Sequence, residues 1–438
     1  MNLARALRVA RTARVAFTGA GGKTTALFQL ARAVEPPVVV TSSTHLGAWQ
    51  ADLADHHLII SRAEDVQRFA GQIEGVTVIT GPAGEDQRLQ GLDGAALGAV
   101  HELAGQLGFP VLVEADGSRQ KPLKAPADHE PVIPAWIDTV VVVAGLSALG
   151  KPLGPETVHR YERYAETGEA RTGQPVSEES IARMLVHPLG GLKGIPAEAR
   201  RVALLNQADE SSLVEAGFRI ANRVTRVYHS ILVSALSEQR IWQVIEPIAG
   251  IILAGGNSSR YGQPKMLLPW QGKALVRHAA ESALVAGLDP VVVVTGAVVE
   301  PVREALSGLP IQFAHNAAWQ EGQSTSVRAG LSEIPDSTGG AVFLLADQPY
   351  VTADLLKKLV NRYRAVLGPV TAPRAAGKRA NPVLFDRDLF ASLMELEGDT
   401  GGRAIIGQHP VTYVEWPDDR ILIDIDRLED YERLMGDD

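Results

Sequence analysis

The chain of 438 residues contains no cysteine. Disulfides, thiolate metal sites, iron–sulfur clusters and cysteine nucleophiles are therefore excluded. No apolar run approaches the roughly 18 residues that a membrane-spanning helix requires. Basic residues are not in excess either, since 42 Lys and Arg stand against 51 Asp and Glu, for a net charge of −9. We therefore expect a cytoplasmic protein with no membrane partner and no nucleic-acid partner.

What is present suits an ordinary globular protein, with 45% hydrophobic and 21% charged residues. At roughly 150 residues per domain, the length predicts two or three units. Strand-like apolar runs alternate with amphipathic segments in two successive series, the pattern of parallel sheets with helices on both faces. We predict an α/β protein of two doubly wound domains, residues 1–246 and 247–438.

The predicted strands fall into the same two series. The first series covers 14–18, 38–42, 76–80, 111–115, 139–144 and 202–206, and the second covers 249–253, 290–295, 341–346 and 368–372. Residues 274–286 and 353–366 are predicted to be helices. Residues 1–34 are basic and lack acids, as organellar presequences do. We interpret them instead as a first helix and strand, because cleavage would destroy a glycine motif that begins at Gly19.

That motif reads Gly-Ala-Gly-Gly-Lys-Thr-Thr over residues 19–25, between an apolar run and a helical segment. Gly19, Gly21 and Gly22 let backbone N–H groups approach phosphate oxygens, Lys23 can reach terminal phosphates, and the Thr24 hydroxyl can ligate Mg²⁺. The spacing is shorter than the standard Walker loop and similar to that of ATP-dependent amide ligases. The alternatives are a glycine turn that packs a helix on a strand and, with a poorer fit, a dinucleotide fingerprint.

Two further segments end predicted strands of this half. Glu114 and Asp116 close the run at 111–115, where carboxylates can hold Mg²⁺ or polarise water, and we select Asp116 as a metal ligand. Asn206-Gln207-Ala-Asp209 is similar to the base-reading element of GTPases, with Gln207 in place of the usual lysine. A plain turn at a strand end is the alternative.

Through residues 19–25 and the run 114–134, residues 1–240 resemble the YqeC-type selenium-dependent hydroxylase accessory proteins. The resemblance implies a P-loop-like fold that binds ATP or GTP. It also implies a role in maturing molybdenum hydroxylases, hence a transient complex with a hydroxylase of the xanthine dehydrogenase type. Lys121 and Lys124 either contact an anionic ligand or belong to a solvated loop.

The second half opens with another glycine loop, Leu-Ala-Gly-Gly at 253–256, followed by Arg260 and Pro264-Lys265. The glycines let the backbone approach a nucleotide. Arg260 and Lys265 can neutralise the charge that builds on a departing pyrophosphate. The spacing of these residues predicts a site that grips a triphosphate.

Carboxylates follow downstream. Asp347 ends the buried run 341–346 at the crevice where open α/β sheets bind ligands. A strand over 421–426 would put Asp424 and Asp426 on one face, and we select Asp424 as the second Mg²⁺ ligand. The alternative is a surface strand with solvated acids. Hydroxyl groups at residues 324–326 are expected beside the same crevice.

From residue 249 onward the chain resembles the molybdenum cofactor cytidylyltransferases, through these motifs, Asn-Pro-Val-Leu-Phe at 381–385 and Gly-Asp-Thr-Gly-Gly-Arg at 398–403. The resemblance implies a Rossmann-like nucleotidyltransferase that uses Mg²⁺ and moves CMP from CTP to molybdopterin. It assigns Lys265, Arg260 and Asp347 to catalysis; Leu253, Ala254, Gly255 and Gly256 to nucleotide; Asp347 and Asp424 to metal; and Ser324, Ser326, Asn381 and Arg403 to molybdopterin.

The sequence departs from the cytidylyltransferase pattern at two places, which leaves the nucleotide and the acceptor open. Relatives with cytidylyl activity commonly show Leu-Ala-Ala-Gly, whereas Gly255-Gly256 is more typical of guanylyltransferases, although Pro264 favours the cytidylyl group. Ala380-Asn381 stands where relatives tend to have Gly-His. Guanylyl transfer to molybdopterin, cytidylyl transfer to a sugar or polyol phosphate, and a nucleotide-switched chaperone for cofactor delivery remain as alternatives.

Overall fold

The computed structural model describes residues 1–84, 88–256, 264–425 and 427–436. The chain divides into two compact units, Met1–Ile245 and Glu246–Asp438. Each unit has its own sheet and its own buried apolar cluster. Across the described ranges, helices are either too short or too polar to cross a membrane.

The N-terminal unit is built on a sheet with the order β13-β12-β11-β9-β1-β7-β2-β5-β4. All neighbours are parallel except β13, which pairs antiparallel with β12. The strands are β1 (Arg14–Gly19), β2 (Val38–Ser42), β4 (His56–Ile59), β5 (Val76–Thr80), β7 (Val111–Glu114), β9 (Thr139–Gly145), β11 (Arg200–Asn206), β12 (Ser230–Ala235) and β13 (Arg240–Ile245). β2 and β5 are buried along their whole length, which explains why such strands are rich in valine and isoleucine and show no regular apolar–polar alternation.

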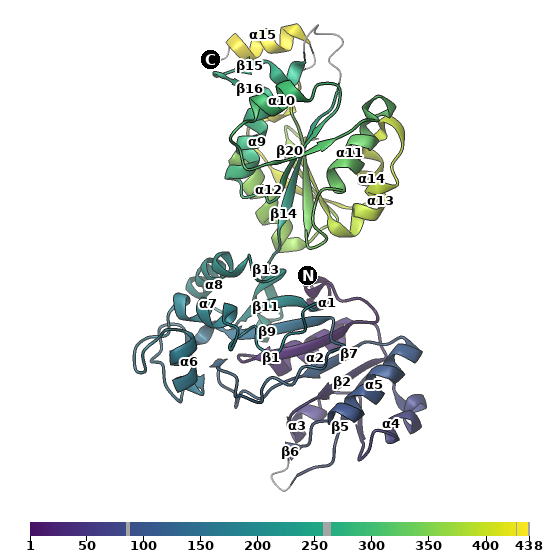
Figure 1. The fold of residues 1–438 in the computed structure, drawn as a ribbon, viewed down its shortest axis with the longest axis vertical. Coiled ribbons are helices and arrows are strands. Elements are labelled where there is room, and N and C mark those ends of the chain that lie inside the picture. Colours follow the sequence, from purple (N-terminus) through teal and green to yellow (C-terminus); the bar gives the residue numbers. More distant parts are fainter. Residues whose placement is uncertain (85–87, 257–263, 426, 437–438) are drawn as a thin grey trace. The chain divides into compact units, whose positions relative to one another are not determined.

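The chain reverses direction across this sheet at β1. It runs from β1 to β2 on one side and later returns to β9 on the other, so a crevice opens at the carboxyl end of β1. Helices cover both faces of the sheet (Figure 1). They are α1 (Leu3–Leu7), α2 (Lys23–Ala33), α3 (Ala48–Ala51), α4 (Asp65–Arg68), α5 (Gly94–Leu107), α6 (Tyr161–Thr167), α7 (Glu178–Val186) and α8 (Ser211–Val224).

The C-terminal unit has a mixed sheet in the order β18-β17-β14-β19-β22-β20-β21, with β23 paired to β20. β14 is parallel to β17 and β19, whereas β22 is antiparallel to both β19 and β20. The strands are β14 (Ile248–Ala254), β17 (Val291–Thr295), β18 (Gln312–His315), β19 (Gly340–Leu345), β20 (Val370–Ala375), β21 (Lys378–Arg379), β22 (Val383–Asp386) and β23 (Val411–Glu415).

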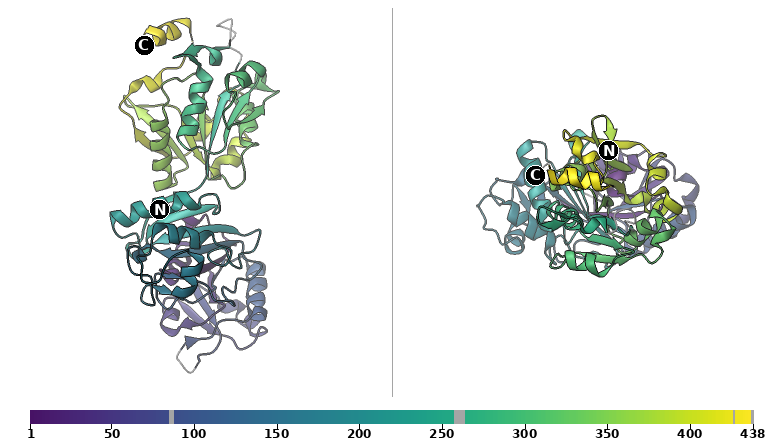
Figure 2. Two further views of the ribbon diagram at one scale, coloured as in Figure 1. Left: turned by 60° about the vertical axis from the view of Figure 1, so that its left-hand side comes forward. Right: turned by 90° about the horizontal axis from the view of Figure 1, so that it is seen from above.

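Two groups of helices enclose this second sheet. They are α9 (Leu275–Val285), α10 (Glu300–Ala305), α11 (Gln323–Leu331), α12 (Ala353–Val366), α13 (Phe390–Met394), α14 (Arg403–Ile406) and α15 (Leu428–Gly436). α9 and α12 lie on one face, and α11, α13 and α14 lie on the other (Figure 1). α11 approaches β14 closely, because a Cβ on Gly330 would lie 2.4 Å from Ile251 Cγ2. The last helix, yellow in Figure 2, packs beside the hairpin of β15 (Pro269–Trp270) and β16 (Lys273–Ala274).

One predicted strand is wrong. Residues Asp419–Leu422 form a 3₁₀ helix, and Ile423 to Ile425 follow outside any strand. Ile421 and Ile425 are both buried, but a separation of four residues puts two side chains on one face of a helical turn and of a strand alike, so this pattern could not distinguish the two. Asp426 lies outside the described residues, so its expected place beside Asp424 is not described.

Candidate functional site

The glycine loop of the N-terminal unit joins β1 to α2 at the crevice beside β1. Gly19, Gly21 and Gly22 have φ angles of +88°, +92° and +115°, where a side chain would be strained. A Cβ on Gly19 would also lie 2.2 Å from Val143 O, and one on Gly21 would lie 2.4 Å from the backbone of Gly145. Glycine is therefore required both by the backbone conformation and by the close approach of β9.

Lys23, the first residue of α2, is buried, with 2% of its side chain exposed. Its Nζ donates a hydrogen bond to Gly19 O at 2.6 Å and lies 3.2 Å from Asp116 Oδ1. The next residue, Thr24, donates from its hydroxyl to Glu114 Oε2 at 3.3 Å. Burial raises the pKa of Glu114 above its ordinary value, against the opposing effect of the Lys23 charge. The predicted phosphate-binding lysine is thus held at a pair of strand-end carboxylates.

A cleft of about 500 Å³ opens over this loop. Its lining includes Gly21, Gly22, Lys23, Thr24, Glu114, Lys121 and Gln207. Gly19 and Asp116 line a neighbouring cavity of about 40 Å³ instead. The structure therefore brings most of the predicted phosphate site to one cleft but leaves Asp116 outside it, with Glu114 facing the ligand space.

The residues of the segment 206–209, which is similar to a GTPase base-reading element, lie in different environments. Gln207 lines the cleft with a φ of +63°. Asn206 is buried and supports the glycine loop, because its amide donates to Gly21 O at 2.8 Å while its carbonyl accepts from Leu236 N. Asp209 does not line the cleft; its carboxylate accepts from Ser237 at 3.4 Å.

Lys121 and Lys124 differ in burial and in their ion-pair partners. Lys121 lines the cleft and pairs with the exposed Glu156. Lys124 has only 2% of its side chain exposed and donates to Glu130 Oε2 at 2.8 Å, 2.9 Å from Asp116 Oδ2. For Lys124 a solvated loop is therefore excluded. Burial opposes ionisation of Glu130, but hydrogen bonds from Arg160 and Lys124 outweigh it and lower the pKa to about 2.

In the C-terminal unit a cleft of about 520 Å³ lies at the carboxyl ends of β14 and β19. Leu253, Gly255, Gly256, Lys265 and Asp347 line it, whereas Ala254 is buried and does not. Lys265 and Asp347 form an ion pair across it. Arg260 lies outside the described residues.

The hydroxyl groups expected beside the crevice, at the start of α11, differ in whether they line a cavity. Ser326 lines the first cleft, and a Cβ on Gly255 would lie 3.2 Å from its Oγ. The buried amide of Asn316 donates to Thr325 Oγ1 at 2.8 Å and to Ser326 Oγ at 2.9 Å. Ser324 is fully buried and lines neither cavity of this unit. Ser326 therefore lies in the cleft beside the glycine loop, whereas Ser324 is inaccessible from both cavities.

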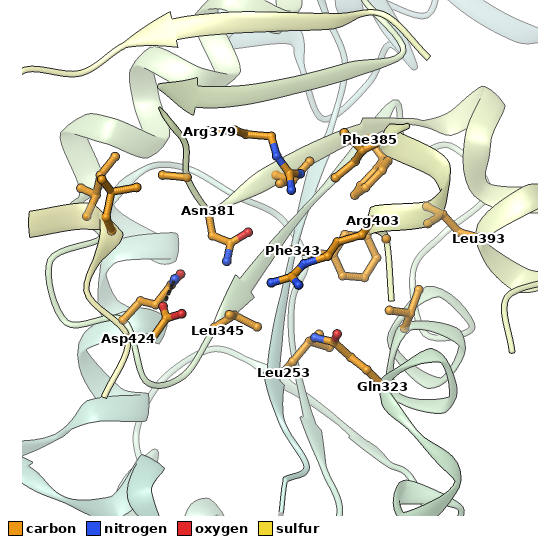
Figure 3. A pocket seen from close by; sticks show the side chains of 18 residues that line it. Leu253, Gln323, Phe343, Leu345, Arg379, Asn381, Phe385, Leu393, Arg403 and Asp424 are labelled. Atoms are coloured by element: carbon orange, nitrogen blue, oxygen red, sulfur yellow. Dashed lines mark hydrogen bonds between the residues drawn. The ribbon is translucent and has the colours of Figure 1, made fainter. Parts of the chain in front are cut away.

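A second cavity of about 230 Å³ adjoins the first, and the two share Leu253, Gln323 and Leu345. Asn381 and Arg403 line it as expected, together with Arg379, which the sequence analysis missed (Figure 3). Its wall contains Phe343 and Phe385, whose rings meet edge to face at 5.7 Å. Arg379 ends the short β21, and only the tertiary structure brings it beside Arg403.

Asp424 lies at the edge of this second cavity and accepts a hydrogen bond from Gln348. The next residue, Ile425, donates its backbone N–H to Asp347 O at 3.2 Å. The two segments that carry the predicted metal carboxylates are therefore adjacent. Within the described ranges, no group of three or more His, Asp or Glu side chains could hold a metal by itself.

Comparison with known proteins matches each half to a family. The MobA-like NTP transferase domain covers residues 250–413, and the YqeC protein family covers residues 15–162. Nicotine blue oxidoreductase of Paenarthrobacter nicotinovorans is 30% identical over 43% of this chain and 96% of its own length. The uncharacterized protein YqeC of Escherichia coli is 28% identical over 44% of this chain and 75% of its own length.

A third relative is the molybdenum cofactor cytidylyltransferase of Escherichia coli, 27% identical over 41% of this chain and 92% of its own length. The two family matches lie on opposite sides of the division between the structural units. The chain is therefore a fusion that belongs to the YqeC family through its N-terminal half and to the MobA-like nucleotidyltransferases through its C-terminal half.

Proposed function

We propose that the C-terminal unit transfers CMP from CTP to molybdopterin, giving molybdopterin cytosine dinucleotide and pyrophosphate. The observation that carries this proposal is the pair of adjoining cavities at the carboxyl ends of β14 and β19. One is lined by the glycine loop and Lys265, as a triphosphate requires. The other combines aromatic walls with guanidinium groups, as a flat anionic acceptor requires.

In this mechanism the terminal phosphate of the acceptor attacks the α-phosphorus of CTP in line. A bond forms from the acceptor oxygen to that phosphorus, and the bond to the bridging oxygen breaks, so pyrophosphate leaves with the electron pair. The backbone of Gly255 and Gly256 approaches the nucleotide. Lys265 exchanges its ion pair with Asp347 for the phosphates and, with Arg260, offsets the charge on the leaving group.

Mg²⁺ suits the oxygen donors at this site. Asp347 and Asp424 supply two carboxylates, and the buried Gln348 Oε1 has no hydrogen-bond partner within the described part of the chain. Two protein carboxylates completed by phosphate oxygens and water are typical of Mg²⁺. When bound, the ion would offset triphosphate charge and orient the reacting groups.

Guanylyl transfer to molybdopterin is the second candidate, and Gly255 favours it. A methyl group at this position would lie 3.2 Å from Ser326 Oγ, so glycine leaves more room for a base than the alanine common among cytidylyltransferases. Cytidylyl transfer to a sugar or polyol phosphate is weaker, because such enzymes lack a YqeC-type partner.

For the N-terminal unit we propose a P-loop-type site that binds ATP or GTP and assists delivery of the finished cofactor to a molybdenum hydroxylase. The cleft over Lys23 and Thr24 supports nucleotide binding. Thr24 and Glu114 would offer oxygen ligands for Mg²⁺ in this cleft, whereas Asp116, which lines the neighbouring cavity, would have to exchange its ion pairs with Lys23 and Lys124 to join them. In the chaperone alternative, one or both nucleotide sites would act as switches that time delivery of the cofactor to the hydroxylase.

The test is pyrophosphate release by the full chain with Mg²⁺ and molybdenum-loaded molybdopterin, with CTP, GTP and ATP offered separately. Release with CTP and a cytidine dinucleotide product would support the first candidate, and release with GTP would support the second. Asp347→Ala should abolish release in both cases. If wild-type protein releases no pyrophosphate with any nucleotide, molybdopterin transfer is refuted, and transfer to another acceptor and the chaperone alternative both gain support.

A further inference from the structure

Arg379 and Arg403 enter the second cavity of the C-terminal unit from different elements, β21 and the start of α14. Neither side chain forms an ion pair or hydrogen bond with the part of the chain that the structure describes. Figure 3 shows their guanidinium groups and the Asn381 amide turned toward one space, with Phe343 and Phe385 nearby. Arg379 is half-buried and Arg403 is exposed, so both guanidinium groups can donate hydrogen bonds to an anion that enters this cavity.

Arg374 shows that a guanidinium group facing the cavity is not a general property of the arginines on the hairpin of β20 and β21. Arg374 on β20 pairs in register with Arg379 on β21. Its guanidinium, however, donates to Glu415 at 2.7 Å and stacks on Tyr413. Arg374 does not line the cavity. Of these two neighbouring arginines, one has a protein carboxylate as its partner and the other faces a space for a ligand.

We propose that Arg379 and Arg403 together bind an oxyanion of the acceptor and so determine which acceptors the C-terminal unit accepts. This inference rests on the proposed transfer to molybdopterin and adds a second recognition point, Arg379, to it. Asn381, between the two arginines, can donate its amide to the same oxyanion. The guanidinium fork matches tetrahedral oxyanions, so two forks select a doubly charged group over a neutral one.

Molybdopterin offers such chemistry at two places, its terminal phosphate and the oxo groups of its bound molybdenum. Both are oxyanions, so the cavity alone accommodates either. Acceptor with and without molybdenum distinguishes them. If the arginines bind the phosphate, both forms depend on them equally; if they bind the metal group, only the loaded form does.

The experiment uses the full chain and four variants: Arg379→Met, Arg403→Met, Arg379→Lys and, as the matched control, Arg374→Met. Binding of loaded and metal-free molybdopterin is measured without nucleotide by equilibrium ultrafiltration. Each cavity variant with methionine should weaken binding by about 10- to 100-fold, because a charge-assisted bidentate contact is lost. Arg379→Lys should lie in between, and Arg374→Met should bind within about twofold of wild type.

Pyrophosphate release supplies the second readout. The KM for the acceptor should rise in the cavity variants while the KM for the nucleotide stays within about twofold. Unchanged acceptor binding in both methionine variants would overturn the proposal. If wild type binds acceptor through the arginines but never releases pyrophosphate, the arginine site stands and the transfer reaction fails; thermal melting of every variant shows that each is folded.

Discussion

Lys124 is the residue whose removal most directly tests the charge arrangement in the N-terminal unit. Its Nζ lies 2.9 Å from Asp116 Oδ2 and donates to Glu130 Oε2 at 2.8 Å and to Gly117 O at 2.6 Å. Substitution by methionine shortens the side chain by one heavy atom, keeps its unbranched shape and removes all three interactions. Two buried carboxylates then lose a shared cation, which is costly because the surrounding protein cannot solvate them as water does.

Breaking a buried ion pair from one side typically costs about 3–5 kcal/mol. Here each carboxylate keeps a second cation, since Asp116 retains Lys23 at 3.2 Å and Glu130 retains Arg160 at 2.7 Å. We therefore expect Lys124→Met to lower the free energy of unfolding of the N-terminal unit by about 3 kcal/mol, at the lower end of that range. Lys121→Met is the matched control; its partner Glu156 is 94% exposed, so its loss should cost below about 1 kcal/mol.

Native-state hydrogen exchange, read by mass spectrometry on peptides from β1 and β7, reports the unfolding of this unit within the full chain. A loss of about 3 kcal/mol corresponds to exchange that is roughly 100-fold faster. Peptides from β14 and β19 in the other unit should be unchanged. Equal exchange in the Lys124→Met and Lys121→Met proteins would refute the reasoning that burial makes the Lys124 pairs costly to break.

Three further predictions concern acid stability, catalysis and backbone strain. The pKa of Glu130 is lowered from 4.5 to about 2, so its contribution of about 3 kcal/mol to the free energy of unfolding is present above pH 4.5 and disappears as the pH falls toward 2. Urea unfolding at a series of pH values should show that Glu130→Gln lacks this loss of stability between pH 4.5 and 2. The same loss in the variant as in wild type would contradict the shift. Asp347→Asn should reduce kcat for pyrophosphate release by at least about 100-fold without changing the melting temperature, because the carboxylate beside Lys265 is lost. A reduction of kcat below about tenfold would show that Asp347 has no part in catalysis. Gly322 has a φ of +120°, and a Cβ there would lie 2.5 Å from the backbone of Gly398. Gly322→Ala should therefore destabilise the C-terminal unit by about 1–3 kcal/mol, measured by thermal unfolding. A variant as stable as wild type would show that the backbone relaxes around the added methyl group without strain.

The strands that could be predicted share one physical property. β1, β2, β5, β7, β9 and β14 are buried on both faces, so the sequence shows them as continuous apolar runs. β4 and β18 are partly exposed edge strands, and β22 runs antiparallel to its neighbours; none of them was predicted. Periodicity carries little signal for the edge strands β4 and β18, because long-range pairing decides where they form. β22 and β12 are buried along their whole length and were missed in spite of that burial.

The residues at the site divide in a similar way. Local patterns were the basis for selecting the glycines of both loops, Lys23 and Asp347, which follow strand ends closely. Lys265 lies well after the end of β14 and was selected from its Pro-Lys motif. Arg379 was not selected, because nothing nearby in the sequence marks the cavity that it faces. Glu114 was noted as a strand-end carboxylate, but Asp116 was selected in its place as the metal ligand, and it is Glu114 that lines the cleft. Asp424 was selected for the wrong reason, since the segment that carries it is not a strand.

By itself, the sequence determined that this protein has two α/β halves, each with a glycine loop after its first sheet strand, because glycine at a strand end and apolar periodicity are local properties. Only the tertiary structure decided that Lys124 is buried between Asp116 and Glu130, that Ser324 is inaccessible, and that Arg379 shares a cavity with Arg403. Those contacts join residues on separate elements. Their energies depend on burial and on which charges meet, and both arise only when the chain has folded.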